Sequence, residues 1–227
     1  MTTKRRKSEA SWPAAGSIFS FVPADSASRA GSVAQQLSRT LTEDPGVAVL
    51  LADFDRRDHS VWRANEAPRR LDGRTWGAFI SEGDSGGTQV LHAREVHPCH
   101  LGPLLDYARE HYTIVCADLT GATEAHAAEV LRASTAIFVV GSAQRSSIEG
   151  VCEKASWLRR IDVADRCALL LDRVPHGLSR DEAEEITGLP LCCFVENDAD
   201  ILHLATWLTA NALAGSECEE DVLALAG

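Results

Sequence analysis

Two kinds of segment alternate along the chain. One kind is short and almost continuously apolar, as in TAIFVV and CALLLD, which is typical of strands covered on both faces of a sheet. The other kind has apolar residues at i, i+3 and i+4, as in IEGVCEKASWLRRI, which is typical of an amphipathic helix. Strands are predicted near residues 17–22, 47–53, 88–92, 112–118, 135–140, 167–173 and 190–195. With helices between them, the pattern predicts an α/β domain whose doubly wound, mostly parallel sheet is flanked by helices.

The pattern weakens in three places. Residues 58–87 are rich in Arg, Gly, Ser and Asp, and predict a loop with a short helix around TWGAFIS. Residues 1–16 contain Lys4-Arg5-Arg6-Lys7 and predict a disordered basic tail, whereas residues 214–227 predict an acidic tail. The folded domain is therefore expected to span residues 17–213.

Residues 17–57 have the layout of a phosphate-binding loop, in which a strand, a loop, a helix and a second strand follow one another. Such a loop needs glycines for backbone N–H groups to close on an anion, a lysine for the β/γ oxygens, and a hydroxyl for Mg²⁺. The loop PADSASRAG contains no lysine, and Arg29 is its only cation. The architecture is retained while the phosphate chemistry is missing.

The chain resembles ParA/MinD-type ATPases, whose loop reads KGGVGKTT. When VAQQLS is aligned with the helix that follows this loop, those eight positions fall on Asp25 to Ser32. Ala30 then occupies the place of the phosphate lysine, and Asp25 the place of a second lysine that crosses a dimer interface. VLLADFDRRD resembles the strand ending in DxDxR, and YTIVCADLTGA resembles the Walker B strand. The segment from LLLDRV to ILHLAT, residues 169–206, resembles the ending of the CpaE/TadZ branch.

This resemblance implies a P-loop NTPase-like fold of the MinD/ParA type with a remnant nucleotide site. The residues assigned to the remnant are Ser26, Ser28, Arg29, Ala30, Gly31, Ser32, Val33, Asp53, Asp55, Asp118, Asp172 and Asn197. Asp172 stands where relatives carry an Asn near the base, which weakens the case for adenine recognition. If Mg²⁺ is bound, the expected ligands are Ser32, Asp55 and Asp118.

No catalytic residue and no cofactor are expected, because the lysine is absent. Weak binding of ATP or ADP with Mg²⁺ stays open, since the N–H groups of Gly31 to Val33 begin a helix and could hold an anion. His92, His97, Cys99 and His100 lie close together but match no usual zinc spacing, so a surface loop leading into a helix is favoured.

Composition narrows the expected partners and location. A formal net charge of −11 argues against nucleic acid, whose phosphates require a surplus of Lys and Arg. No apolar run approaches the ~20 residues of a membrane span, and the seven cysteines suit reduced thiols. We expect a cytoplasmic protein without a transmembrane segment, which a protein partner could recruit to the inner membrane.

Two classes of function follow from the resemblance. The first is a catalytically silent domain, a pseudo-ATPase that localises, assembles or regulates a cell-surface apparatus such as a pilus, secretion or polysaccharide machine. Its partners would be proteins of that system, with a homodimer or a monomer both open. The alternative is an active ATPase or a relative of polysaccharide-linked kinases with a divergent phosphate loop. The tyrosine-rich tail of those kinases is absent, since the only tyrosines are Tyr107 and Tyr112.

Overall fold

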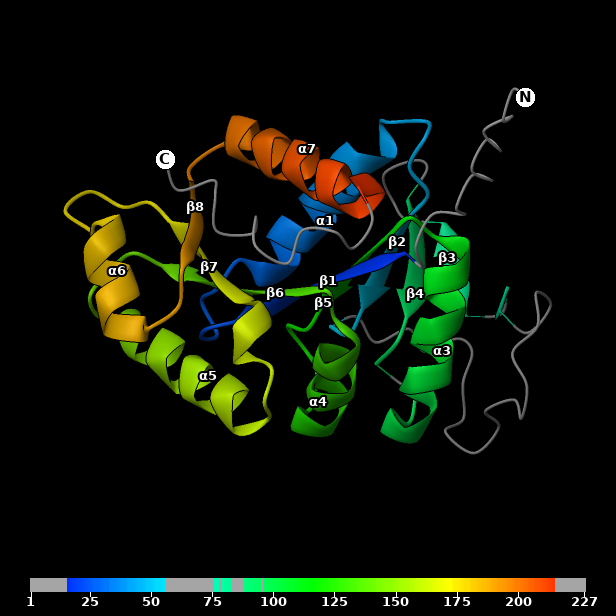
Figure 1. Cartoon of the computed structure of the whole chain (residues 1–227), viewed down its shortest axis with the longest axis horizontal. Coiled ribbons are helices and arrows are strands. Elements are labelled where there is room, and N and C mark those ends of the chain that lie inside the picture. The colour runs from blue at the N-terminus through cyan, green and yellow to red at the C-terminus, as the bar shows by residue number, and fades with distance from the viewer. Residues whose placement is uncertain (1–15, 56–75, 78, 83–87, 95, 215–227) are drawn as a thin grey trace, which may run out of the picture.

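The computed structural model describes residues 16–55, 76–77, 79–82, 88–94 and 96–214. An eight-stranded sheet lies between two layers of helices, in the order β3-β4-β2-β5-β1-β6-β7-β8 (Figure 1). Every neighbouring pair is parallel except β3 with β4. The strands are β1 Ser17–Pro23, β2 Val49–Asp53, β3 Ile80–Glu82, β4 Gln89–His92, β5 Ile114–Asp118, β6 Ala136–Ser142, β7 Cys167–Asp172 and β8 Leu191–Val195.

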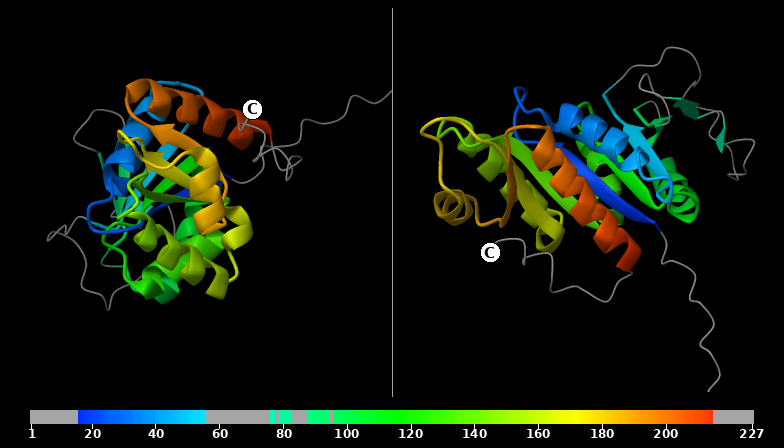
Figure 2. Two further views of the ribbon diagram at one scale, coloured as in Figure 1. Left: turned by 90° about the vertical axis from the view of Figure 1, so that its left-hand side faces the viewer. Right: turned by 90° about the horizontal axis from the view of Figure 1, so that it is seen from above.

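One face of the sheet is covered by α1 (Ala30–Thr42) and α7 (Asp198–Ala214), which lie side by side (Figure 2). The other face carries α3 (Pro98–His111), α4 (Glu124–Ala133) and α5 (Ile148–Arg160), with α6 (Arg180–Thr187) beside α5. A short 3-10 turn at Ala164–Arg166 leads into β7. Helices on both faces require strands that are apolar on both sides, which explains the continuous apolar runs.

Local signals set several helix ends. Thr123 begins α4 by accepting a hydrogen bond from the His126 N–H. Ser179 and Glu182 form a reciprocal capping box at the start of α6. The same helix ends at Gly188, whose φ of 66° costs glycine less than a residue with a Cβ atom.

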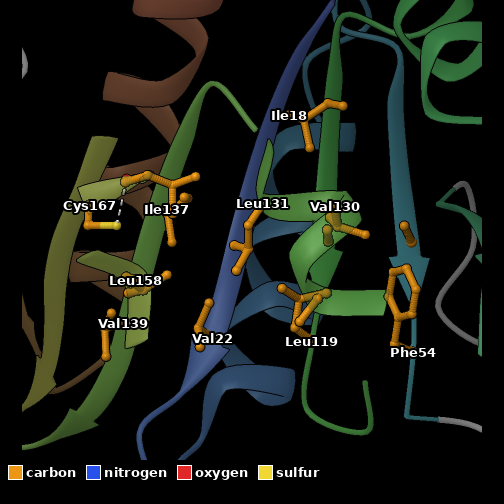
Figure 3. Close-up of a cluster of buried hydrophobic side chains, with 14 of the residues drawn as sticks. Ile18, Val22, Phe54, Leu119, Val130, Leu131, Ile137, Val139, Leu158 and Cys167 are labelled. Carbon is orange, nitrogen blue, oxygen red and sulfur yellow. Dashed lines mark hydrogen bonds between the residues drawn. The ribbon is translucent and has the colours of Figure 1, made fainter. Parts of the chain in front are cut away.

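The core consists of two clusters, one on each face of the sheet. Beneath α1 and α7, Phe21 and Phe138 stack with ring centroids 5.5 Å apart. On the opposite face, residues of β1 and β6 pack against Val130 and Leu131 of α4 and Leu158 of α5 (Figure 3). The β1 strand is central and contributes side chains to both clusters.

All seven predicted strands are present, and the predicted fold class is confirmed. The short helix predicted around residues 75–81 is wrong in its second half. Trp76 is helical, but Ile80 and Ser81 belong to β3, which pairs antiparallel with β4. The predicted tails, apart from Gly16 at one end and Ala214 at the other, and most of the loop 58–87 lie outside the described residues. Among the described helices, none has the length and apolar character needed to cross a bilayer.

Parallel strands place their carboxyl ends at one edge of the sheet, where α/β proteins bind ligands. Pro23, Asp53, Asp118 and Asp172 all end strands at this edge. Asp53 and Asp118 are register partners on the adjacent strands β2 and β5, whereas Asp172 ends β7. The fold thus brings the three strand-end acids of the predicted site to one side of the domain.

Candidate functional site

The loop between β1 and α1 is closed by its own side chains. The Asp25 carboxylate accepts a hydrogen bond from the Ala27 N–H at 2.8 Å, and the Asp25 carbonyl accepts one from the Ser28 N–H at 3.2 Å. The Ser28 hydroxyl donates to the Val140 carbonyl of β6 at 2.6 Å. The Asp25 carboxylate therefore already accepts a hydrogen bond from a backbone N–H that a bound phosphate would need.

Neighbouring strands and α5 hold the start of the loop closely. Ala24 donates its N–H to the Val140 carbonyl at 2.9 Å. Gly150 of α5 lies so near that a Cβ atom there would sit 2.9 Å from the Ala24 carbonyl oxygen. The loop is thus packed between β6 and α5, while Ser26 and Ala27 at its tip are exposed.

Helix α1 begins without a cation at its first turn. Ala30 is fully buried, and its N–H lies 3.3 Å from the Ser28 hydroxyl oxygen. Val33 is buried and donates its N–H to the Arg29 carbonyl, as the first complete helical bond. Arg29 is the N-cap residue but makes no side-chain cap bond. The first turn retains the favourable dipole end of a helix but has no lysine.

The Arg29 side chain is directed to Asp172 at the end of β7. Its Nε lies 3.1 Å and 3.0 Å from the two carboxylate oxygens, and its Nη2 lies 2.5 Å from Oδ1. The hydrogen bond to Asp172 raises the pKa of Arg29 above its ordinary value. Two of the predicted site residues are thus in direct contact, in an arrangement that neutralises the cation of the loop.

Asp118 at the end of β5 is a buried acid with incomplete hydrogen bonding. Its Oδ1 accepts from the Thr120 N–H at 2.9 Å and from the Thr120 hydroxyl at 2.5 Å. Its Oδ2 is buried and has no hydrogen-bond partner. Burial raises the pKa of Asp118, against the Thr120 hydrogen bonds, and the nearby charges of Asp53 and Asp55 add to the rise.

In helix α1, Gly31 faces this carboxylate. A Cβ atom at Gly31 would lie 2.8 Å from Asp118 Oδ2 and 3.2 Å from the Thr120 hydroxyl. Ser32 is exposed on the following position of the helix. The helix position that faces Asp118 therefore has no hydroxyl, and Ser32 as a magnesium ligand stays a prediction.

Asp53 and Asp55 lie at and just after the end of β2. Asp53 is buried, and its Oδ1 accepts the Asp55 N–H at 2.8 Å. The Asp55 side chain is exposed, and its carbonyl accepts a hydrogen bond from Arg94 Nη1 at 2.7 Å. Arg94 was not among the predicted site residues, and no spacing in the sequence connects it with Asp55.

Asn197 has a structural role at the start of α7. Its Oδ1 accepts the Ala199 N–H at 2.8 Å, while its own N–H donates to Asp200 at 3.1 Å. The next residue, Asp198, accepts a hydrogen bond from Gln36 of α1. This residue of the predicted remnant site is thus exposed and used as a helix cap.

The histidines and cysteine near residue 97 begin α3 as expected. His97 is the N-cap residue and accepts a weak hydrogen bond from the Cys99 N–H at 3.4 Å. Within the part of the chain that the structure describes, no three His, Cys, Asp or Glu side chains are grouped as a metal site.

These residues do not fit a magnesium nucleotide. The position expected for the phosphate lysine is the buried Ala30, Gly31 faces Asp118 without a side chain, and the loop closes on the Asp25 carboxylate. The buried Asp118 Oδ2, which has no hydrogen-bond partner, is a group that would favour a cation. We therefore derive no phosphoryl-transfer step for this site.

No protein-family model matches the sequence, and no curated protein matches it. Among solved structures, the chain is similar to a ParA family ATPase from Chlorobium tepidum TLS, with a TM-score of 0.65 and 15% identity over 93% of this chain and 96% of that one. It is similar to MinD from Pyrococcus horikoshii OT3, complexed with Mg-ADP, with a TM-score of 0.58 and 15% identity over 92% and 94%. It also resembles the MinC:MinD cell division complex of Aquifex aeolicus, with a TM-score of 0.63 and 11% identity over 84% and 86%. The chain has the fold of the ParA/MinD-type P-loop ATPases.

Proposed function

We propose that this chain is a catalytically silent protein of the ParA/MinD fold that acts through contacts with other proteins. The observation that carries the proposal is the Arg29–Asp172 ion pair, because Arg29 is the only cation in a loop that lacks the phosphate lysine. With Arg29 paired, the loop supplies no free cation to stabilise the charge that develops on a transferred phosphoryl group.

The position of the ion pair makes Arg29 a poor substitute for the lysine. Asp172 ends β7, whereas the Walker B acid Asp118 ends β5, and β1 and β6 lie between these strands. Three strand spacings separate the two acids by roughly 14 Å. The guanidinium is therefore held on the β7 side, away from the carboxylates that would organise a metal.

Hydrolysis of ATP by the purified chain tests the proposal directly. We expect release of phosphate in the presence of Mg²⁺ to equal that of buffer, and Asp55→Ala to leave it unchanged. Magnesium-dependent turnover that Asp55→Ala abolishes would establish the alternative, an active ATPase or a kinase relative with a divergent loop. The unsatisfied Oδ2 of Asp118 is the observation that favours this alternative.

A pair of double variants asks whether the site is a decayed form of an active one. Ala30→Lys with Arg29→Gly restores the missing charge and the glycine before it, and should raise the affinity for ATP with Mg²⁺. Ala30→Met with Arg29→Gly is the matched control, because it adds a chain of similar bulk without charge. Equal affinities for both variants would mean that the loop has lost the backbone conformation that binds phosphate.

We infer that the protein serves as a localisation, assembly or regulatory factor for a cell-surface apparatus, such as a pilus, secretion or polysaccharide machine. The support is the resemblance of residues 169–206 to the CpaE/TadZ branch, together with a net charge of −11 that disfavours nucleic acid. In this proposal the protein is cytoplasmic and a protein partner recruits it to the inner membrane. Deletion of the gene, followed by measurement of surface pili, secreted proteins and capsular polysaccharide, should impair one of the three.

A homodimer is the second part of the proposal. Asp25 stands in the place of the lysine that crosses the dimer interface in relatives, so association should not depend on nucleotide. Asp25 of one copy could pair with Arg29 or Arg56 of a second copy, but Arg29 is already paired within its own chain and Arg56 lies outside the described residues. Light scattering with and without ATP should report the same mass. A monomer that dimerises only with ATP would contradict both this assembly and the silent site.

A further inference from the structure

The strand β8 carries two adjacent cysteines on one face of the sheet. In a regular strand, successive side chains point to opposite faces. The pairing of β7 with β8 shifts between Leu169 and Leu170, so that Leu170 pairs with Cys193 and Cys192 is the extra residue of a bulge. The bulge interrupts the alternation at this point.

The packing of the neighbouring residues shows the result of this bulge. Leu191 and Phe194 pack in the cluster beneath α3, α4 and α5, on one face. Cys192 and Cys193 both pack against the cluster beneath α1 and α7, on the other face. The two adjacent cysteines therefore share the face of the sheet that α1 and α7 cover.

Two features make this pair accessible and reactive. Both side chains are only partly buried, on a strand at the edge of the sheet beside α7 (Figure 1). The interaction with Cys193 lowers the pKa of Cys192, and the charge of Arg180 acts in the same direction, although burial opposes both. The same interaction and burial raise the pKa of Cys193, so Cys192 is the more reactive thiol of the two. Arg180 is held nearby by donating to the Leu191 carbonyl. A thiolate is the form of cysteine that binds metals and metalloids.

The other described thiols differ from this pair. Burial raises the pKa of Cys116 and of Cys167 to about 12, so both suit an inert core. Cys99 is exposed at the start of α3, and Cys152 donates to the Ile186 carbonyl at 3.7 Å. These cysteines lie on separate elements, so only Cys192 and Cys193 offer two adjacent sulfur atoms in the described part of the chain.

We propose that Cys192 and Cys193 form a two-sulfur site for a soft, thiophilic centre, either a trivalent arsenical or a monovalent copper ion. Soft sulfur ligands select soft ions and metalloids, and two thiolates are enough for a centre that binds only a small number of ligands. With an arsenic oxide, two As–S bonds form, the two thiol protons leave with the oxide oxygen as water, and no electron is transferred. With Cu(I), the ion replaces thiol protons, which pass to the solvent. Neither reaction requires an oxidant.

The test uses the full chain with Cys99, Cys152 and Cys218 changed to Ser, so that the pair and the two inert core thiols remain. One arm adds phenylarsine oxide, and the other adds Cu(I) as its bicinchoninate complex under reducing conditions. We expect one equivalent of at least one probe to bind, detected by intact mass or by loss of the colour of the copper complex. Cys192→Ser or Cys193→Ser should weaken binding by roughly 10²–10⁴-fold, because a two-point attachment becomes a single one.

Thermal unfolding distinguishes a site of the folded protein from trapping of unfolded chains. A ligand that binds the native state raises the melting temperature, whereas one that binds the unfolded chain lowers it. We expect the melting temperature to rise in the protein that carries only the Cys99, Cys152 and Cys218 substitutions. We expect no rise when Cys193→Ser is added. Absence of binding by both probes, unchanged binding in both single variants, or a fall in the melting temperature would overturn the proposal. Binding of only one probe would identify which of the two centres the site accepts.

Discussion

Arg29 and Asp172 meet across the end of β6, although 143 positions separate them in the sequence. Arg29 Nε lies near both carboxylate oxygens, and Nη2 makes the shortest contact, at 2.5 Å to Oδ1. The pair ties the start of α1 to the end of β7, so the loop of the candidate site is anchored by charge on one side and by the Ser28–Val140 hydrogen bond on the other.

The first prediction concerns the energy of this pair. The Arg29 side chain is 51% exposed and that of Asp172 is 21% exposed, so water screens the attraction considerably. A double-mutant cycle with Arg29→Gln and Asp172→Asn, followed by urea unfolding, should give a coupling of about 0–1 kcal/mol. The exposed pair Glu129 and Arg132 on α4 is a suitable comparison. A coupling above about 2 kcal/mol would show that the pair is far less solvated than its exposure indicates.

The second prediction is a dependence of stability on pH through Asp118. Its pKa is raised in the folded protein, so the folded state holds this proton more tightly than the unfolded chain does. The free energy of unfolding should therefore fall as pH rises from the unfolded value of about 3.9 to the raised folded value, and should then stay level with respect to this group. Asp118→Asn should remove that fall and be neutral or stabilising at pH 7.

Measurement of the urea midpoint from about pH 3.5 to about pH 8 tests this dependence. The range begins near the ordinary pKa of an aspartate and extends well above it. Asp106→Asn on α3 serves as the control, because Asp106 is exposed and should leave the profile parallel to that of the wild type. A loss of stability in Asp118→Asn that appears only towards pH 8 would show that the ionised carboxylate stabilises the fold, and would contradict the raised pKa.

The third prediction uses two glycines that lie in helices. Gly31 faces Asp118 Oδ2, where a Cβ atom would be 2.8 Å away, whereas nothing lies within 4 Å of a Cβ atom at Gly102 in α3. A helical Gly→Ala change gains about 1 kcal/mol where space is free. Gly102→Ala should show such a gain, and Gly31→Ala should show none or a loss. Equal gains in thermal unfolding would mean that Asp118 moves away at little cost.

The sequence predicted the sheet well because each of seven strands is an apolar run that is long enough to stand out. It did not predict β3, since Ile80–Glu82 is only three residues long and pairs with a single neighbour. It identified Arg29 as the only cation of the loop, but not its partner. That partner depends on the position of β7 relative to β1 in the sheet, which no local pattern encodes. The bulge at Cys192 was likewise hidden, because LCCFV reads as a regular strand.

The fourth prediction concerns the capping box of α6. The Ser179 hydroxyl lies 3.4 Å from the Glu182 N–H, and Glu182 accepts the Ser179 N–H at 3.0 Å. Ser179→Ala should cost about 1 kcal/mol of stability, measured by urea unfolding. Ser147→Ala is the matched control, because Ser147 begins α5 without a side-chain cap bond and should change stability by much less. If both variants lose the same stability, the loss in Ser179→Ala does not come from the helix cap.

The central position of β1 has a consequence for synthesis of the protein. Its two neighbours in the sheet are β5 and β6, in which Ile114 pairs with Ser17 and Ala136 pairs with Phe19. At roughly 5–20 residues per second, a ribosome needs on the order of ten seconds after making β1 before both partner strands have been made. During that interval an apolar strand that contains Phe19 and Phe21 has no native partner on either edge. Chaperone supply and translation rate, rather than final stability, should therefore limit the yield of soluble protein.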